Sequence, residues 1–562
     1  MLRSTALLAV LSLLARAYAH GQLHEALFDI VTHLNAAIPL LAPGEQSELA
    51  ELDLLAARRA KATAAYESAL TLLAAGLAAL GHDAWRREPA LAFDLHAEQA
   101  ECEYLSGALD RALARLEHIE PHAATSVHRL QLIDLRVVLH ASMGNTRAAL
   151  QAGRLGLAAA GIELPEDPTA CRLAVADELA RIDHLLARTP LAALVDAPPL
   201  RDPAMRGVLK LLADMLAPAN LTHPDLYALI NTTQARLSIE HGHTDISAYT
   251  YVVYGFFLAT VLRQYPQADQ FGRFALELND RLDNPALRCR LRFVYATYSH
   301  FTRPLRSVLA EFSAALDDGR EAGDHIYSAS ACSHILISRI SLGDPLAEVH
   351  EQADRLLALT QRTRVSSAAA TQTVARQLVS ALRGRNLAPH SLADEHFDEH
   401  AFVARCERSG MTFALRWYAT ASLLLALLFD RGADARALID RFGPPIAGNF
   451  GFYFTTEFAF LAALALARLA ADAPPDERPA RLAELATYAD PLAAWALACP
   501  ANFAHRAALV AAERAALTGD DAAAITAYDA ALEAARAAGF VAHEALTCEL
   551  AARFHRQRGR AG

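Results

Sequence analysis

Lysine is almost missing from this chain of 562 residues, in which only Lys61 and Lys210 occur. A phosphate-binding P-loop needs a glycine-rich turn followed by a lysine, because backbone N–H groups and the ammonium hold the phosphates together. Neither lysine follows such a turn, and the catalytic-loop and D-F-G motifs of protein kinases are missing as well. We therefore expect a chain that is not an enzyme, with no catalytic residues and no cofactor. Any ATPase or kinase activity would reside in other domains.

Paired cysteines are also missing. The seven cysteines are odd in number and widely spaced, and none of them forms a C-x-x-C pair. Disulfide frameworks and zinc sites need closely spaced or evenly paired cysteines. The pattern predicts buried thiols in a reducing compartment, and it gives no metal site.

Concentrated positive charge and long apolar runs are scarce too. The net charge is −11, and the basic residues are almost all arginines spread along the chain, which argues against a nucleic-acid surface. The longest uncharged apolar stretch, 248–262, is shorter than the ~20 residues that cross a bilayer. We expect neither nucleic acid nor a membrane span among the partners of this chain.

The N-terminus allows two interpretations. Arg3, the apolar run 6–15 and the small residues 17–19 resemble a signal peptide. Helical spacing, however, continues through Leu23, Leu27, Ile30 and Leu34, and Arg16 interrupts the run. We favour an amphipathic helix and a cytoplasmic protein, and a secreted helical binding protein is the alternative.

What the sequence does contain is helical. Hydrophobic residues make up 53%, largely as Ala and Leu, whereas runs of Val, Ile and Thr are rare. Glycine turns at Gly107 and Gly144 lie 37 residues apart, close to the ~34 of a tetratricopeptide unit, and the clearest such unit lies near 507–540 around Gly519. We predict an all-α fold, a right-handed α-solenoid of tetratricopeptide-like helical hairpins. Its segments would be 1–383 and 401–562, joined by an exposed loop at 384–400.

The central stretch 241–255 predicts a helix that neighbours must cover, capped at its start by Thr244 or Asp245. Its tyrosines could line a concave groove, although an aromatic stripe at helical spacing is more often core. The two histidines before it could bind a ligand or merely shape the turn. The candidate ligand or partner surface is therefore His241, His243, Asp245 and Tyr249.

Several phrases along the chain resemble the helical-repeat region of large signalling proteins. In those proteins a P-loop ATPase of the signal-transduction class precedes this region, and a GAF domain and a histidine kinase often follow it. The matching phrases are residues 27–35, 57–69, 101–105, 161–165, 241–255, 275–278, 323–324 and 499–503. The sequence departs from the pattern at His243, where Asn is expected, and at Phe301, where Trp is expected.

The resemblance implies a sensor or scaffold segment that binds a protein partner or a small signal on a concave surface. The expected protein partner is a signalling ATPase or histidine kinase, in the same polypeptide or in a separate one. An extended concave surface is what stacked helical repeats offer.

Two histidine patterns suggest other chemistry. The phrase 299–305 resembles the phospho-accepting helix of histidine kinases, which makes a phosphotransfer remnant that uses His300 the alternative function, although the phrase is one residue short. His396 and His400 have a spacing that suits zinc, yet no third ligand is evident, so we predict a solvated acidic loop there.

The last helix is predicted to lack a cover. It carries Leu546, Leu550 and Phe554 at helical spacing near the end of the sequence. Because solenoids need polar terminal caps, we expect fraying or self-association through uncapped ends.

Overall fold

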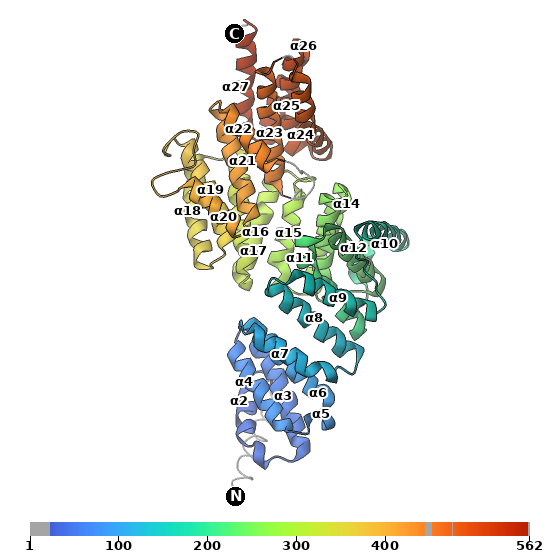
Figure 1. Ribbon diagram of the computed structural model, residues 1–562. Helices are drawn as coiled ribbons and strands as arrows, with labels where there is room; N and C mark the ends of the chain where they lie inside the picture. Colours follow the sequence, from blue (N-terminus) through green and yellow to red (C-terminus); the bar gives the residue numbers. More distant parts are fainter. Residues whose placement is uncertain (1–22, 444–451, 475, 560–562) are drawn as a thin grey trace. The chain divides into compact units, whose positions relative to one another are not determined.

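The computed structural model describes residues 23–443, 452–474 and 476–559, and this part of the chain is all-α (Figure 1). Its only extended contacts are two isolated bridges, Pro199 with His243 and Asp394 with Phe397. The segment that resembles a signal peptide lies outside the described residues.

The chain divides into two compact units. The first comprises Met1–Thr189 and Ala197–Thr244, and the second comprises Pro190–Asp196 and Asp245–Gly562. The predicted loop 384–400 lies inside the second unit.

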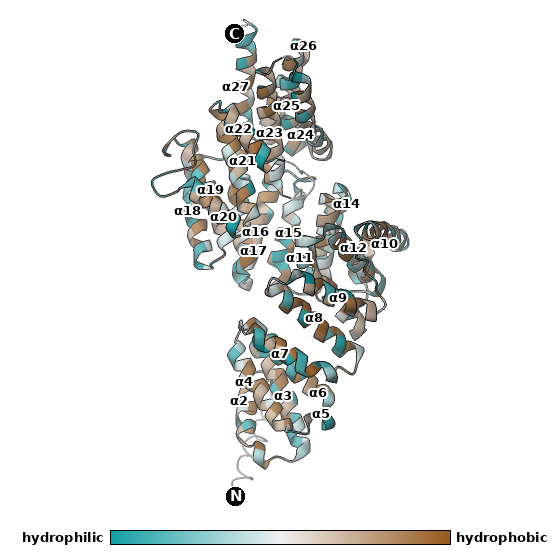
Figure 2. Cartoon of the chain, in the orientation of Figure 1, coloured by the Kyte–Doolittle hydropathy of each residue, from teal (hydrophilic) through white to brown (hydrophobic). Residues whose placement is uncertain are grey.

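The first unit consists of helices joined by short turns. Its elements are α2 (Leu23–Ala36), η1 (Ile38–Leu40), α3 (Pro43–Ala62), α4 (Tyr66–Leu80), α5 (Ala84–Arg87), α6 (Pro89–Leu105), α7 (Leu109–Ile119), η2 (Glu120–His122), α8 (Ser126–Ser142), α9 (Thr146–Ala159), α10 (Pro168–Arg188), α11 (Pro203–Thr222) and α12 (Pro224–His241). Figure 2 shows the alternation of apolar and polar residues along α8, whose Leu130, Leu135 and Leu139 are buried. One-faced helices of this kind need neighbours that cover the apolar stripe.

The second unit is longer and contains the central helix of the sequence. Its elements are η3 (Leu191–Asp196), α13 (Ser247–Thr260), α14 (Tyr265–Arg281), α15 (Pro285–Ser299), α16 (Leu305–Ala322), α17 (His325–Leu342), α18 (Leu346–Arg362), α19 (Ser366–Leu382), α20 (Glu399–Arg408), α21 (Thr412–Leu428), α22 (Gly432–Phe442), α23 (Tyr453–Ala471), α24 (Arg478–Ala498), α25 (Pro500–Thr518), α26 (Asp521–Ala538) and α27 (Val541–Gln557). The sequence places the cap of the central helix at Thr244 or Asp245, whereas α13 begins at Ser247 with Ile246 at the N-cap.

Local chemistry sets where these helices begin and end. Thr125 and Asp520 accept the backbone N–H three residues on, which caps α8 and α26. Gly343 and Gly519 adopt left-handed backbone angles that end α17 and α25, a conformation that costs glycine little. The predicted turn at Gly519 is therefore confirmed, and α25 and α26 pack together as a helical hairpin.

The odd-numbered helices of the second unit form an inner row. From α13 to α27, each odd-numbered helix packs on the next one, and even-numbered helices such as α14, α16 and α26 pack on their chain neighbours. The row curves back on itself, because α17 also contacts α23 and α27. This repeating arrangement is that of an α-solenoid.

Helix α23 lies in the interior of this row. Among the described helices it alone is long and apolar enough to pass for a membrane span, and 72% of its most apolar window is buried within the protein. Its composition follows from packing, because α21, α24 and α25 cover it as well as α17.

An asparagine joins two distant turns of the second unit. Asn502, at the start of α25, is fully buried, and its Oδ1 accepts a hydrogen bond from the Leu305 N–H at 2.8 Å. Its Nδ2 donates to the carbonyl oxygens of His300 and Arg303, at 2.7 and 2.8 Å. Phrase 499–503 of the resemblance therefore has a structural role, since it fixes the turn between α15 and α16.

The segment between α19 and α20 is held by one carboxylate. Glu399 accepts hydrogen bonds from the N–H groups of Leu392 and Ala393 at 2.8 and 3.1 Å and from the Tyr418 hydroxyl at 2.8 Å. Leu392 is buried, so this segment is partly anchored in the unit.

The C-terminal helix is covered, which corrects the prediction of an exposed apolar face. Leu546 and Phe554 are buried, and Leu550 is half-buried. The cover comes from earlier helices, since α27 packs on α17, α25 and α26. Sequence order hides this, because α17 lies about two hundred residues upstream of α27. Six of the cysteines are buried as predicted, whereas Cys548 on α27 is exposed.

Candidate functional site

An apolar cavity of about 370 Å³ that is partly open to solvent lies along the inner row of the second unit. Helices α17, α19, α21, α23 and α27 all contribute to its wall. Leu378, Leu424 and Leu461 are among the aliphatic side chains that line it. A largely apolar cavity of a few hundred cubic ångströms with a few polar groups is typical of small-molecule sites.

Two of the polar groups that line the cavity belong to a buried ionic network. Glu457 on α23 pairs with Arg506 on α25, with Oε2 and Nη2 separated by 2.8 Å. Its other oxygen, Oε1, lies 2.9 Å from Nε2 of His543 on α27, and Nδ1 of His543 lies 2.8 Å from Nε2 of His505. The network therefore connects the three helices α23, α25 and α27.

The Glu457 carboxylate determines which atom donates and which accepts in each hydrogen bond between Glu457, His543 and His505. A carboxylate can only accept, so His543 donates from Nε2 to Glu457, and its Nδ1 then accepts from Nε2 of His505. Burial lowers the pKa of both histidines, although Glu457 opposes this shift at His543. Burial would raise the pKa of Glu457, but Arg506 and His543 lower it to about 2. The result is an ionised Glu457–Arg506 pair flanked by two neutral imidazoles.

The Arg506 side chain has no exposed area. It donates to the Tyr453 hydroxyl and, at 3.2 Å, to Oγ1 of Thr456, whereas its Nε has no hydrogen-bond partner in the described part of the chain. Its guanidinium carbon lies 4.9 Å from the centre of the Tyr453 ring and 5.5 Å from that of Phe503. The ion pair, these hydrogen bonds and the two rings offset the cost of burying the guanidinium.

One further polar group at the cavity has no partner. Trp417 on α21 lines the cavity, is almost fully buried, and its indole N–H makes no hydrogen bond within the described part of the chain. An unpaired buried N–H carries a desolvation cost of ~1–3 kcal/mol.

The surface predicted from the sequence falls in both units. His241 and His243 belong to the first, whereas Asp245 and Tyr249 belong to the second. His243 is buried, which lowers its pKa, and its carbonyl accepts a hydrogen bond from the Leu200 N–H at 2.8 Å. His243 thus has a structural role in the turn. His241 and Asp245 are exposed, and Tyr249 is half-buried beneath Arg290, whose guanidinium carbon lies 5.7 Å from the ring centre.

The aromatic stripe of α13 is core. Tyr251, Tyr254 and Phe257 are buried and pack on Phe271 or on one another. The sequence therefore predicted a buried helix here, whereas the apolar cavity of about 370 Å³ is lined by helices further along the chain.

The alternative phosphotransfer residue is inaccessible. His300 is fully buried, with its ring 4.1 Å from that of Phe301, and burial together with Arg506 lowers its pKa to about 3. A phosphoryl acceptor must meet a phosphodonor in solvent, so this position argues against phosphotransfer.

The sequence predicts a solvated acidic loop and no zinc site at His396 and His400. Both histidines line a hollow of about 550 Å³ beside Glu399. In the described residues no three His, Cys, Asp or Glu side chains gather closely enough to hold a metal ion.

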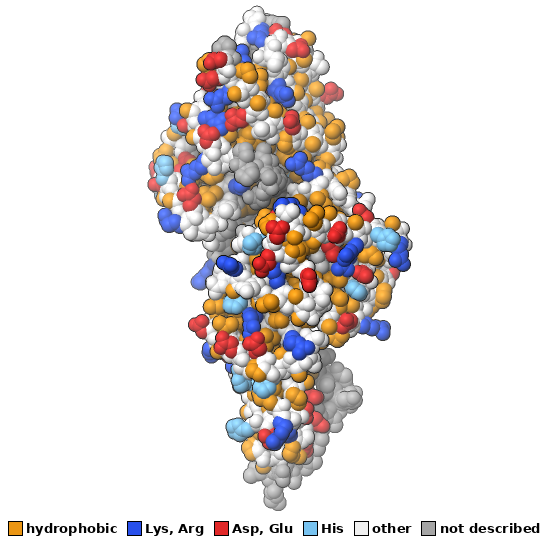
Figure 3. Space-filling model, turned by 45° about the vertical axis from the view of Figure 1, so that its right-hand side comes forward, with side chains coloured by type: hydrophobic (Ala, Val, Ile, Leu, Met, Phe, Trp, Pro, Cys, Tyr) orange, Lys and Arg blue, Asp and Glu red, His pale blue; other side chains and the backbone are white. Residues whose placement is uncertain are grey.

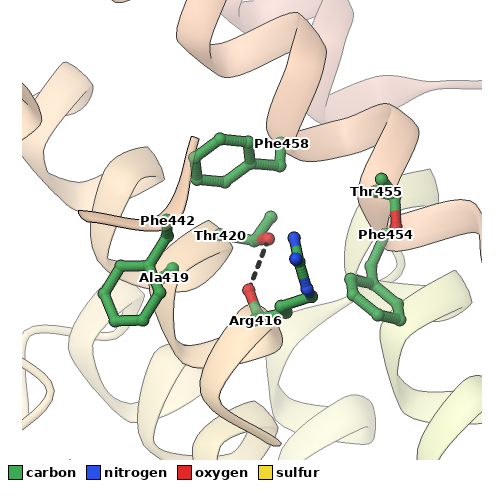
Figure 4. A pocket seen from close by; sticks show the side chains of 7 residues that line it. All are labelled: Arg416, Ala419, Thr420, Phe442, Phe454, Thr455 and Phe458. Carbon is green, nitrogen blue, oxygen red and sulfur yellow. Dashed lines mark hydrogen bonds between the residues drawn. The ribbon is translucent and has the colours of Figure 1, made fainter. Parts of the chain in front are cut away.

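A second, much smaller hollow of about 20 Å³ lies beside α21 and has room for one water molecule. The guanidinium of Arg416 extends between the rings of Phe442 and Phe454, with Phe458 above them (Figure 4). Burial lowers the pKa of Arg416. The hollow is too small for an organic ligand.

On the face that Figure 3 shows, basic and acidic side chains are interspersed. No large basic patch of the kind that binds nucleic acid gathers on this face.

The sequence analysis missed the site residues Glu457, Arg506 and His543. One signal was available, because Glu457 is one of only two charged residues in the apolar helix α23, the other being Arg468. A single carboxylate within an apolar helix demands a buried partner. The sequence could not name Arg506 or His543 as that partner.

No protein-family model matches the sequence, and no curated protein matches it. Among solved structures, a chain from the structure of Naa15/Naa10 bound to HypK-THB aligns with 13% sequence identity and a TM-score of 0.26, over 100% of this chain and 99% of that chain. A TM-score of this size does not indicate a common fold.

Proposed function

We propose that this chain is a non-catalytic sensor or scaffold that receives a protein partner or a small signal on the inner row of its second unit. The observation that supports the proposal is the apolar cavity of about 370 Å³, which helices of that row line. Stacked helical repeats use such concave surfaces for binding. The partner we infer is a signal-transduction ATPase or a histidine kinase, in the same polypeptide or a separate one, because of the sequence phrases described above.

The same helices suggest how binding would be transmitted. Helix α27 packs on α17, so a group bound between them contacts the end of the row and its middle together. Occupancy would change how firmly α27 is held and therefore what surface it offers to a kinase or ATPase. A ligand shifts such an equilibrium only by its difference in affinity for the two states.

The test uses a signal-transduction ATPase and a histidine kinase from the same organism, each produced separately. We expect the full chain to bind one of them and to change its rate of ATP hydrolysis or autophosphorylation. The variant Ala545→Phe places a ring at the cavity mouth from an exposed position on α27, and we expect it to alter that regulation. The matched control is Ala552→Phe, an exposed site on the same helix outside the cavity.

The proposal fails if neither enzyme binds the chain and neither rate changes. The same assay addresses phosphotransfer. With labelled ATP and the kinase, we expect no label on the chain, and label that is lost in His300→Ala would overturn the non-catalytic interpretation.

A further inference from the structure

We propose, resting on the function proposed above, that the cavity takes an uncharged apolar small molecule, and that this ligand clamps α27 onto α17. The cavity, its charges and the seam beside it each support one part of this statement.

The charges at the wall select against ions. Three carboxylates line the cavity, those of Asp344, Glu457 and Glu549, whereas no lysine or arginine does. An anion would lose its water of hydration without a lysine or arginine at the wall to pair with.

A cation gains little, because each of these carboxylates is already paired. Asp344 lies 2.8 Å from Arg306 and 2.7 Å from Arg339, Glu457 pairs with Arg506, and Glu549 pairs with Arg553. A neutral molecule is therefore the occupant that the electrostatics favour.

Most of the remaining wall is aliphatic, which rewards an apolar body of small-molecule size. A neutral apolar molecule is therefore the class that this wall favours.

The seam between α17 and α27 explains the clamp. Gly343 ends α17 with φ of +77°, and a Cβ at this position would come within 2.5 Å of the backbone nitrogen of Ala542, at the start of α27. Both residues line the cavity, as do Leu346 on one side of the seam and Leu546 on the other. A ligand that touches both sides adds contacts that exist only while α27 is docked.

The experiment uses the full chain and the neutral dye Nile red, which carries a ring carbonyl, with the anionic dye 8-anilinonaphthalene-1-sulfonate for comparison. We expect saturable binding of one Nile red per chain and at least tenfold weaker binding of the anionic dye. Hydrogen exchange of peptides from α27 should slow several-fold at saturating Nile red, whereas peptides from α8 in the first unit should not change.

Two variants locate the probe. Ala545→Phe at the cavity mouth should weaken Nile red binding at least tenfold, and Ala552→Phe should leave it unchanged. Leu424→Asn replaces a half-buried aliphatic side chain of the wall with a polar one of similar size, and it should weaken Nile red binding several-fold. Circular dichroism and the thermal midpoint show whether each variant is folded, and Leu424→Asn serves if Ala545→Phe does not fold.

The proposal is overturned if Nile red does not bind, if neither variant weakens it, if the anionic dye binds equally well, or if α27 shows no added protection. Failure here with intact regulation of the ATPase or kinase would remove the ligand class but leave the scaffold function. If Nile red binds but neither the ATPase nor the kinase is regulated, the ligand class would stand and the scaffold function would fail.

Discussion

The two units bury their charged groups differently. In the first, Glu98 on α6 pairs with Lys61 at 2.6 Å, and Glu103 pairs with Arg115 at 2.8 Å, but the Lys61 and Arg115 side chains remain 20% and 22% exposed. In the second, Arg506 is 0% exposed and its partner Glu457 only 8%. The basic groups of the first unit thus keep contact with water, whereas the network of the second has lost it.

The difference follows from how the helices are covered. The inner row of the second unit curves back so that α17 meets α23 and α27, and side chains between them are enclosed on every side. The histidines show the same tendency. Four are buried in the second unit, namely His300, His334, His505 and His543, whereas in the first unit His243 is buried and those around Trp85 are half-buried or exposed. Enclosure rather than composition therefore sets the chemistry of each unit.

The largest expected difference between the two units is in how much folding stability each loses in acid. Burial lowers the pKa of His300 and His334 to about 3 and also lowers that of His505 and His543. Each ring is neutral when folded and takes up a proton on unfolding below its ordinary pKa near 6.5, so stability is lost as pH falls from 6.5 toward 3. The loss approaches about 1.4 kcal/mol per pH unit for His300 and for His334, or roughly 3 kcal/mol per unit for the two, and His505 and His543 act in the same direction.

Buried carboxyl groups also affect how much stability each unit loses in acid. Burial raises the pKa of Glu513 and Asp318 in the second unit, and their protonation in the folded state offsets part of the loss. In the first unit the pKa of His96 is lowered to about 4 but that of Asp53 is raised to about 7, so the two shifts act in opposite directions between pH 6.5 and 4. We therefore expect the second unit to open first.

Cysteine labelling resolves the two units. Pulses of 4,4′-dithiodipyridine, which reacts with thiols in acid, should modify the buried cysteines of the second unit before those of the first. The second unit holds Cys289, Cys332, Cys406 and Cys499, and the first holds Cys102 and Cys171. Earlier labelling of the first pair would contradict the comparison.

The next largest effect concerns the buried ion pair. Arg506→Met leaves Glu457 as a buried charge without its main partner, and we expect a loss of ~3–5 kcal/mol in the free energy of unfolding, measured in urea. The counterpart in the first unit is Lys61→Met, where Glu98 keeps Arg58 at 2.6 Å and the expected loss is about 1 kcal/mol or less. Adding Glu457→Gln to Arg506→Met should recover part of the loss. Equal losses for the two single variants would remove the distinction.

A smaller contrast separates backbone strain from packing. Gly144 and Gly343 both have φ of +77°, but only at Gly343 would a Cβ meet another helix. We expect Gly144→Ala to cost ~1 kcal/mol through the left-handed conformation alone. Gly343→Ala should cost at least about 1 kcal/mol more and speed hydrogen exchange in α27, because α27 must shift. Gly539→Ala, at an open turn of the second unit, should behave like Gly144→Ala.

The smallest effect should be equal in both units. Thr125 caps α8 and Asp520 caps α26, and both residues are exposed. Replacement by alanine should cost about 1 kcal/mol in each case, measured by urea unfolding. A much larger cost in one unit would mean that local helix chemistry, and not enclosure, distinguishes the units.

Much of the fold could be predicted from the sequence, because its signals are local. Glycine at 107, 144 and 519 marks turns between helices, and the apolar spacing of 271–282 marks the buried face of α14. The burial of Tyr251 and Tyr254 also follows from an uncharged helix that has to be covered. Hydrogen bonds at helix ends join residues three or four apart, so the sequence contains both partners.

The site could not be predicted, because its partners are far apart in the sequence. Glu457 and His543 are 86 residues apart, and Asn502 and His300 are 202 apart. The candidate surface at 241–249 was chosen for its residue types, and those types do not report which helices enclose a space.

By itself, therefore, the sequence determined that this protein is a stack of helices without the motifs of an ATPase or kinase. Tertiary structure alone decided that the row closes between α17 and α27, that Leu546 and Phe554 are covered, and that a cavity forms over a buried ion pair. The reason is that helix formation depends on neighbours along the chain, whereas burial and pairing depend on neighbours in space.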